Sequence, residues 1–479
     1  MATVFTVVFI AIVVLLNVLV SFLSDKYPLS IDLTSNQSYK LSAKSIQYVK
    51  TIKDKVSITV LADESAYLSS SEYAPCAKIM EQYPKYNSNI SISFVNLTKN
   101  PTFQSNYAKE TLETGDIIVA SGSKYKHIAI NDLLQSSTDQ STGQNQVTGD
   151  QTEQQLDSAL QYLTTTNLPT VMFTTGHSEP SSTDSSDTEA AGLQALLTKN
   201  NYKIETKDIA TDGIDKDASA VVIVDPKADF SAAEIKALDE YLNNGGKMGK
   251  NLYVFYDPQQ GSLPNLEAYT KEWGIQVEKG VVYDETNAVG NVFQPIESSV
   301  DSDTFGSLPN NMHVDLATSR PLTLLFSSKG SKSTTSLVST ESTSRLWDQG
   351  TVTVQAAQNF QPSSSDKKGP FTVMAKSVIE GVSDNNSVKS TVVVSGTSAI
   401  LDQTLLSESN LTNADLVLNM FNNLGGFKSS INIVSKSRTS QTLNLTSGQI
   451  TTMEIFFFVI LPLAVLAVGL AVWLRRRHL

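Results

Sequence analysis

The chain has 479 residues, a length that suits two or three domains. Its hydrophobic fraction of 40% and charged fraction of 18% allow packed cores and exclude a wholly disordered chain. The 36 Lys and Arg against 48 Asp and Glu give a formal charge of -12, so we expect no nucleic-acid partner, because a phosphate backbone requires clustered cations. The single cysteine, Cys76, and the four scattered histidines exclude a disulfide and argue against a metal centre, so we expect neither metal nor cofactor.

The first apolar segment, residues 2–23, predicts a membrane-spanning helix. It contains no charged residue, and 22 residues in a helix reach about 33 Å, enough to cross a hydrocarbon core of ~30 Å. A cleaved signal peptide is the alternative. However, no basic residue precedes the apolar stretch, and residues 24–27 (SDKY) do not resemble a small-residue cleavage site. We therefore expect residues 1–23 to be an uncleaved anchor.

Residues 24–134 are predicted to form a thioredoxin-like α/β domain. A strand, a helix and a second strand form a βαβ unit with parallel strands, and a hairpin follows. This element order is typical of thioredoxin-like folds, although the chain has no C-x-x-C motif that would supply redox chemistry. The expected elements are 56–62, 71–86, 90–97, 116–121 and 126–130.

A second α/β domain is predicted over residues 154–430, after a polar, exposed loop at 135–153. Near-continuous apolar strands separated by helices indicate a doubly wound parallel sheet covered on both faces. A Ser/Thr-rich insertion interrupts it at about 280–390, and the sequence leaves open whether this insertion is a separate lobe. The expected elements are a helix at 154–165, strands at 170–175, 220–225 and 251–256, helices at 188–199 and 231–243, and a closing strand and helix within 391–424; Ser231 and Glu234 form a capping box.

The second apolar segment, residues 455–474, predicts another membrane-spanning helix after a juxtamembrane segment at 431–454. Trp473 stands where an aromatic residue anchors a membrane interface. Arg475, Arg476 and Arg477 follow at once, and the positive-inside rule places this tail, residues 475–479, in the cytoplasm. We therefore expect the chain between the two helices to form an ectodomain outside the cytoplasm.

The most suggestive site follows the strand at 170–175. Gly176, His177 and Glu179 lie where the carboxyl ends of strands bind ligands in open α/β sheets, with Asp184 nearby. We treat these four residues as candidates for binding a ligand or a partner. The alternative is that Gly, Ser, Asp and Pro collect here for turn geometry. Because residues 176–187 contain no apolar anchor, we expect them to face solvent and to be mobile.

Motifs for other chemistry are missing from the sequence. It contains no G-x-S-x-G nucleophile elbow, and the glycines at 245–249 have neither the spacing nor the hydroxyl of a phosphate-binding loop. The chain is therefore not an ATPase. Cys76 follows a proline in an expected helix and is interpreted as a small buried apolar residue.

The chain resembles the auxiliary proteins of gliding-motility-type ABC transporters, the Gld family of bacteria. The matching motifs are DLT followed by YKLS, LDSAL followed by a strand and GHSE, NGG followed by YDP, and VVSGTS followed by a helix with Asn413 and Asn422. Ser178 and Thr397 depart from the family pattern, and the family's arginine before DLT is missing. These stretches lie within 31–42, 154–179, 244–258 and 393–422.

This resemblance implies a non-catalytic auxiliary subunit of a bacterial ABC transport system, with an amidotransferase-like second domain that has lost the cysteine. Its implied partners are a separate ATPase and permease, together with the lipid bilayer through the two helices. The implied location is the cell membrane, with the ectodomain outside the cytoplasm. Two alternatives remain: a membrane-tethered hydrolase or carbohydrate-active enzyme that uses His177 and Glu179, and a stand-alone surface receptor.

Overall fold

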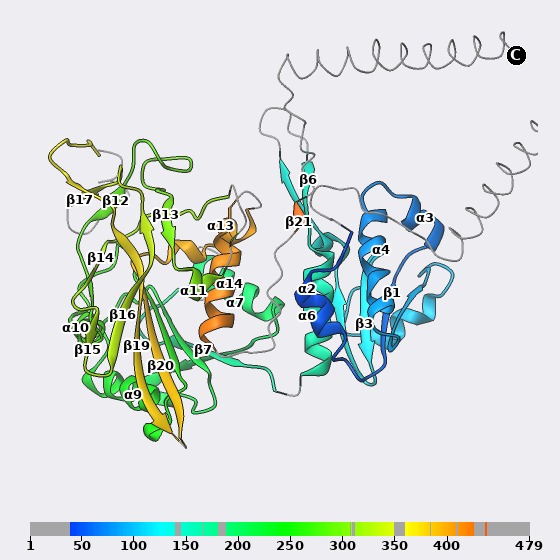
Figure 1. Ribbon diagram of the computed structural model, residues 1–479, viewed down its shortest axis with the longest axis horizontal. Helices are drawn as coiled ribbons and strands as arrows, with labels where there is room; N and C mark the ends of the chain where they lie inside the picture. Colours follow the sequence, from blue (N-terminus) through cyan, green and yellow to red (C-terminus); the bar gives the residue numbers. More distant parts are fainter. Residues whose placement is uncertain are drawn as a thin grey trace, which may run out of the picture. The chain divides into compact units, whose positions relative to one another are not determined.

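The computed structural model describes most of the predicted ectodomain (Figure 1). Both predicted anchors lie outside the described residues, as do Asp184, Trp473, Arg475, Arg476 and Arg477. No helix in the part of the chain described here combines the length and the apolar character needed to cross a membrane. The described residues are 39–138, 145–165, 167–180, 188–306, 308, 312–348, 360–383, 385–408, 411–425 and 436–437.

The first sheet has the strand order β2-β1-β3-β4. β1 and β2 are parallel, and β3 is antiparallel to both β1 and β4, which confirms the predicted βαβ unit and hairpin. Two short helices replace the single predicted helix at 71–86, because Pro75 opens one helix and the chain turns at Glu81 before the next; a third short helix precedes residue 71. The strands are Val56–Val60 (β1), Ile90–Phe94 (β2), Ile117–Ser121 (β3) and Lys124–Ile128 (β4), and the helices are Glu64–Ser69 (α3), Ala74–Met80 (α4) and Gln82–Tyr86 (α5).

Helix α6, Thr152–Thr164, belongs to the core of this first sheet. Leu156, Leu160 and Leu163 recur on one helical face and pack in the cluster that contains the β1 and β3 side chains. The sequence placed this helix at the start of the second domain, because spacing alone shows an apolar face but not its partner. Helix α2, Ala43–Val49, and the buried Cys76 belong to the same cluster.

A small three-stranded sheet, β21-β6-β5, lies where a polar loop was expected at 135–153. Ladder hydrogen bonds come from the backbone, so Ser, Thr and Gln side chains can form strands without an apolar run. The strands are Leu134–Thr138 (β5), Asn145–Asp150 (β6) and Lys436–Ser437 (β21), with the short helices Pro101–Tyr107 (η1) and Ile130–Leu133 (η2) before them.

The second sheet has a parallel half in the order β8-β7-β9-β10-β20. The chain adds β8 on one side of β7 and β9 on the other, so the strand order reverses between β7 and β9. Every residue of β9 and β10 is buried, as their apolar runs predict. The bounds are Thr170–Thr175 (β7), Lys203–Asp208 (β8), Ala220–Val224 (β9), Asn251–Phe255 (β10) and Asn386–Ser395 (β20).

The predicted insertion at about 280–390 extends this sheet with antiparallel strands. β19 pairs antiparallel with β20, so the sheet is mixed rather than purely parallel. The added strands are Ile275–Val277 (β11), Glu297–Val300 (β13), Leu322–Leu324 (β14), Ser328–Lys329 (β15), Lys332–Thr340 (β16) and Thr372–Ser383 (β19); Val281–Tyr283 (β12), Arg345–Trp347 (β17) and Lys367–Lys368 (β18) form a small separate sheet.

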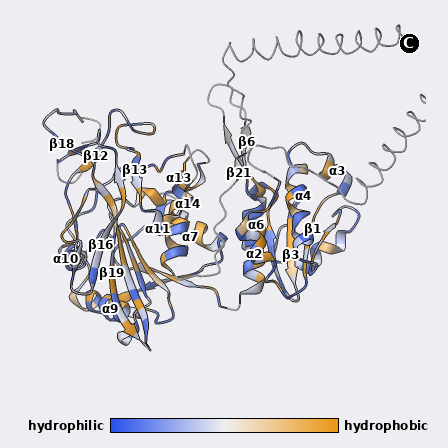
Figure 2. Cartoon of the chain, in the orientation of Figure 1, coloured by the Kyte–Doolittle hydropathy of each residue, from blue (hydrophilic) through white to orange (hydrophobic). Residues whose placement is uncertain are grey.

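Helices cover both faces of the parallel half. One face packs against α7 and α14 around Phe173 and Phe255, and the other packs against α9 and α10 around Met172 and Leu252. Apolar residues accordingly occur along the strands and the helices beside them (Figure 2). The helices are Thr188–Lys199 (α7), Ile209–Asp212 (α8), Ala232–Asn243 (α9), Asn244–Gly246 (η3), Pro264–Glu272 (α10), Ser302–Phe305 (α11), Ala399–Leu401 (η4), Gln403–Ser407 (α13) and Asn413–Leu424 (α14).

Gly192 allows α7 to approach the chain at 401–403. A Cβ atom at this position would lie 2.4 Å from the carbonyl oxygen of Leu401 and 2.8 Å from the backbone nitrogen of Gln403. We expect Gly192→Ala to lower the melting temperature by several degrees, although alanine favours a helix by about 1 kcal/mol. The matched control is Thr198→Ala at an exposed position of the same helix. A Gly192→Ala protein that melts at or above the wild-type temperature would show that this close contact is not required.

Candidate functional site

The candidate site lies at the carboxyl ends of β7 and β9, where the strand order reverses. Open α/β sheets bind their ligands in the crevice at this point. Here the two loops that leave the strands are joined to each other, because the carbonyl oxygen of His177 accepts hydrogen bonds from the backbone N–H groups of Lys227 (2.8 Å) and Ala228 (3.0 Å). The crevice is therefore bridged by the chain itself.

Gly176 positions this bridge. Its φ of +105° lies in a region that residues with a Cβ rarely adopt, and a Cβ here would meet the carboxyl group of Asp208 at 3.0 Å. Ser178 has a φ of +56°, so the chain reverses on both sides of His177. The turn directs the imidazole of His177 inward rather than into solvent.

The imidazole of His177 is held on three sides. Its Nδ1 lies 3.4 Å from Glu179 Oε1, and its Nε2 lies 3.1 Å from Glu234 Oε1 on α9. The ring stacks on Phe230, with 3.7 Å between ring centroids and 14° between planes. Both ring nitrogens therefore face carboxylate oxygens, which accept hydrogen bonds from ring N–H groups.

The two carboxylates have further partners. Glu179 accepts hydrogen bonds from the Thr174 hydroxyl (2.8 Å) and from the backbone N–H of His177 (2.7 Å). Glu234 accepts one from the backbone N–H of Ser231 (2.8 Å), which completes the predicted capping box of α9. Burial alone would raise the pKa of Glu234, but the hydrogen bonds from Ser231 and the interaction with His177 outweigh it and lower that pKa.

Of the residues predicted for this site, Gly176, His177 and Glu179 lie together, and Asp184 is outside the described residues. The expectation that the loop faces solvent is wrong for His177, which is 5% exposed. Sequence reasoning missed Phe230 and the second role of Glu234. The predicted capping box accounts for one hydrogen bond of Glu234. Its contact with His177, 57 positions away in the sequence, forms only when the sheet has folded, so the sequence alone could not show it.

Two further carboxylates, Asp225 and Asp257, lie just after the carboxyl ends of β9 and β10. Asp225 and Asp257 are both buried, and Gln260 joins their loops by accepting a hydrogen bond from the Asp257 N–H and donating one to the Pro226 carbonyl. Burial, together with the nearby Asp257 carboxylate, raises the pKa of Asp225 to about 6 against the opposing hydrogen bond from Lys227. The described residues contain no group of three or more side chains arranged to hold a metal ion.

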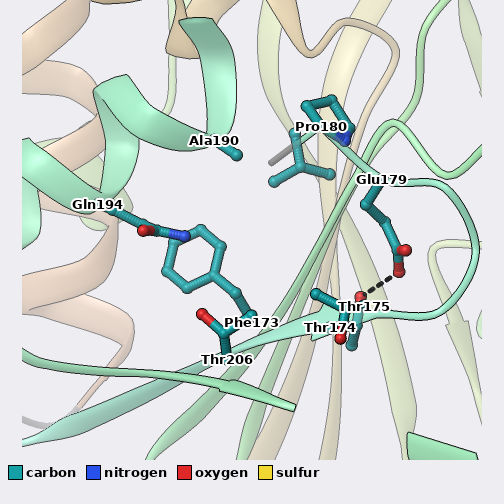
Figure 3. Close-up of a pocket in the computed structure, with 9 residues that line it drawn as sticks. Phe173, Thr174, Thr175, Glu179, Pro180, Ala190, Gln194 and Thr206 are labelled. Atoms are coloured by element: carbon teal, nitrogen blue, oxygen red, sulfur yellow. Dashed lines mark hydrogen bonds between the residues drawn. The ribbon is translucent and has the colours of Figure 1, made fainter. Parts of the chain in front are cut away.

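A small pocket of about 40 Å³ opens on the other side of Glu179, between β7, β8 and α7. Figure 3 shows the Phe173 ring reaching into it from β7, with Pro180 and Ala190 beside it and the Glu179 carboxylate turned toward Thr174. The space holds a few water molecules or one short side chain, which is too small for a nucleotide or an organic cofactor.

A family model described as "ABC-type uncharacterized transport system" matches residues 168–420, more than half of the chain. The chain belongs to this family. Membership indicates an auxiliary component of an ABC-type transport system, in agreement with the coarser part of the resemblance found in the sequence. In this transport auxiliary the match covers the whole candidate site, and a second model, a domain of unknown function (DUF7088), matches residues 35–136.

Two solved structures show a weak likeness to the transport auxiliary. The "mmIFT52 N-terminal domain" is 16% identical, with 53% of this chain and 96% of that chain covered and a TM-score of 0.37. A putative ThuA-like protein from Bacteroides uniformis is 14% identical, with 54% and 91% covered and a TM-score of 0.32. Likenesses this weak support no conclusion on fold or function. No curated protein matches the sequence.

Proposed function

We propose that the chain is a non-catalytic, membrane-anchored auxiliary subunit of a bacterial ABC transport system, which assembles with a separate ATPase and permease. The observation that carries this proposal is the family match over 168–420. In the proposed arrangement, residues 1–23 and 455–474 span the cell membrane, and the described residues form an ectodomain outside the cytoplasm. The finer assignment to the gliding-motility-type family belongs to the same proposal.

The geometry of the candidate site supports a bracing role over catalysis. A general acid or base must reach a substrate with a ring nitrogen or carboxylate oxygen that is available to it. Both ring nitrogens of His177 already face carboxylates, and the His177 side chain is only 7% exposed. Nothing in this arrangement favours the alternative of a hydrolase that uses His177 and Glu179.

We also propose which known folds the two sheets resemble, from their strand order and their helices. In the first sheet, β1 and β2 are parallel and are followed by the β3–β4 hairpin, an order that supports a thioredoxin-like domain. In the second sheet, five parallel strands lie between helices on both faces, which supports a relation to amidotransferase-like domains. The antiparallel extension through β19 is an addition to that plan.

The proposed assembly is tested by affinity purification of the full chain from its native membranes in mild detergent. We expect mass spectrometry to identify an ATPase with a phosphate-binding loop and a permease with several apolar spans among the recovered proteins. The matched control is an unrelated protein with two membrane anchors, purified in the same way. Recovery of neither subunit, or equal recovery with the control, would contradict the proposal.

A further inference from the structure

Helix α6 begins at one end of the first sheet and its helices, here called the first domain. The segment that follows the first predicted anchor joins the fold at this point. The backbone N–H of Ser42 donates a hydrogen bond to Glu153 Oε1 (2.6 Å), and the Ser45 hydroxyl donates another to the same oxygen. Glu153 lies in the first turn of α6. The chain therefore leaves the fold toward the first anchor from the start of α6, which we call the junction end of the first domain.

The segment that precedes the second predicted anchor joins the fold at the same end. Strand β21 pairs antiparallel with β6, with Lys436 opposite Asp150 and Ser437 opposite Gly149 (Figure 1). Asp150 accepts a hydrogen bond from the backbone N–H of Thr152 (2.9 Å), so β6 leads directly into α6. The two segments lie on either side of the whole second sheet in the sequence, yet they attach within a few residues of each other.

The length of chain between these attachments and the anchors limits how far the junction end can lie from a membrane. Residues 24–38 connect the first proposed anchor to the described residues, and residues 438–454 connect them to the second. A fully extended chain of 15 residues spans about 50 Å, and a flexible one has an average length of about 20 Å. Helix α6 has 13 residues and is itself about 20 Å long. Turning the domain over would require both links to stretch along it.

We propose that the junction end of the first domain is the surface that faces the lipid bilayer. This inference rests on the proposed function, because it takes residues 1–23 and 455–474 as membrane anchors, and it adds which surface of the protein meets the membrane. Both anchors then enter the bilayer beneath the same end of one domain.

The opposite end of the first domain offers a competing surface. It lies where α6 ends, because the hydroxyl groups of Thr164 and Tyr48 are hydrogen-bonded there (2.7 Å). Four exposed lysines that form no ion pair with any described residue occur at this end: Lys50, Lys53, Lys55 and Lys85. If attraction to anionic headgroups decided the orientation, this end would face the membrane. Salt screens such an attraction, but it does not weaken the two covalent links.

The orientation is tested with a dye at either end of the first domain. Ser71→Cys places a thiol just before α4, whose Cys76 lies 3.9 Å from Asp150 at the junction end. Ser88→Cys places one just after α5, where Asn87 donates hydrogen bonds to the end of α2. Both serines are exposed, so folding tolerates the changes, and the native Cys76 is buried and stays unlabelled.

The full chain with either label is reconstituted in vesicles of phosphatidylcholine and phosphatidylglycerol that carry an acceptor dye on the headgroups. We expect energy transfer to place the dye at Ser71→Cys about 10–20 Å nearer to the bilayer than the dye at Ser88→Cys, as the length of α6 requires, at both low and high salt. Equal distances, or a shorter distance for Ser88→Cys at either salt concentration, would overturn the inference.

The proposed function is checked in the same vesicles by an alkaline carbonate wash, which removes proteins that lack a membrane anchor. A chain that is washed off contradicts the anchoring, and the proposed function and this inference then both fail. A chain that stays in the vesicles with equal or reversed distances contradicts only the proposed orientation.

Discussion

Replacing His177 by alanine is expected to lower the melting temperature of the purified full chain by about 4–8 °C. The change removes the ring between two buried carboxylates and its stacking on Phe230, and it leaves Glu179 and Glu234 without this partner. Leaving a buried hydrogen-bond acceptor without its donor costs about 1–3 kcal/mol, and more for a charged acceptor. We take about 2 kcal/mol because the contact to Glu179 is long, and convert it at about 2–4 °C per kcal/mol for a domain of this size.

His313 provides the matched control for this experiment. It also pairs with a glutamate, Glu297, at 3.3 Å, but its side chain is 53% exposed. Exposed pairs contribute little, so His313→Ala should change the free energy of unfolding by no more than about 0.5 kcal/mol. If the two variants melt alike, His177 is not a brace, and its availability to a ligand or partner must be reconsidered. If His177 only stabilises the fold, we also expect the His177→Ala protein to assemble with its partners at temperatures below its own melting temperature.

The protein is expected to be more stable at pH 5.5 than at pH 7.5. Burial raises the pKa values of Asp225, Asp315 and Asp415 to about 6 each, although hydrogen bonds to Asp225 and Asp315 oppose the shift. A raised pKa means that the folded chain binds protons between pH 6 and about 4 that the unfolded chain does not bind. The free energy of unfolding therefore rises as the pH falls through 6, by at most about 3 kcal/mol for each group.

This pH dependence has an upper and a lower limit. Above about pH 7 the cost of the buried charges is fully present and no longer changes. Below about pH 4 the trend reverses, because Asp301 and Asp402 have lowered pKa values and lose their favourable interactions as they are protonated. For both residues burial acts in the opposite direction, and hydrogen bonds from Thr304 and Thr188, respectively, are the largest lowering influences.

Asp225→Asn isolates one contribution. Asparagine is similar in shape and tolerates the left-handed backbone at this position, where φ is +41°. We expect the variant to be more stable than the wild type at pH 7.5 and to show a smaller gain at pH 5.5, as measured by melting temperature. Asp63→Asn is the control, since the pKa of exposed Asp63 is lowered to about 2 by hydrogen bonds from Ser65 and Lys99. A wild-type protein that loses stability from pH 7.5 to 5.5 would contradict the assignment.

The parallel half of the second sheet was predictable because local signals agree there. Strands β7, β9 and β10 are apolar runs bounded by turn residues, and the structure places each within a residue of its predicted bounds. Strands β13, β15 and β16 of the antiparallel half were not predictable, because they are rich in Ser, Thr and Lys. Their position depends on pairing with β19 rather than on their own burial.

In the candidate site, too, one part could be predicted from the sequence and another part could not. His177 and Glu179 are two residues apart, so their proximity could be read from the chain, and the turn at Gly176 explains it. The depth of His177 could not be read, because Phe230 and Glu234 reach it only after α9 packs against the sheet. A polar loop after a strand is normally exposed, and here the polar atoms are buried because they satisfy one another.

Strand β20 sets the order in which the second sheet can be completed during synthesis. It pairs with β10 on one side and with β19 on the other, yet β10 ends at Phe255 and β20 begins only at Asn386. A ribosome that adds about 5–20 residues per second leaves the outer edge of β10 unpaired for several seconds. A nascent chain that stops before Asn386 therefore exposes the unpaired backbone N–H and C=O groups of a strand whose residues are all buried in the folded protein, and such an edge favours aggregation.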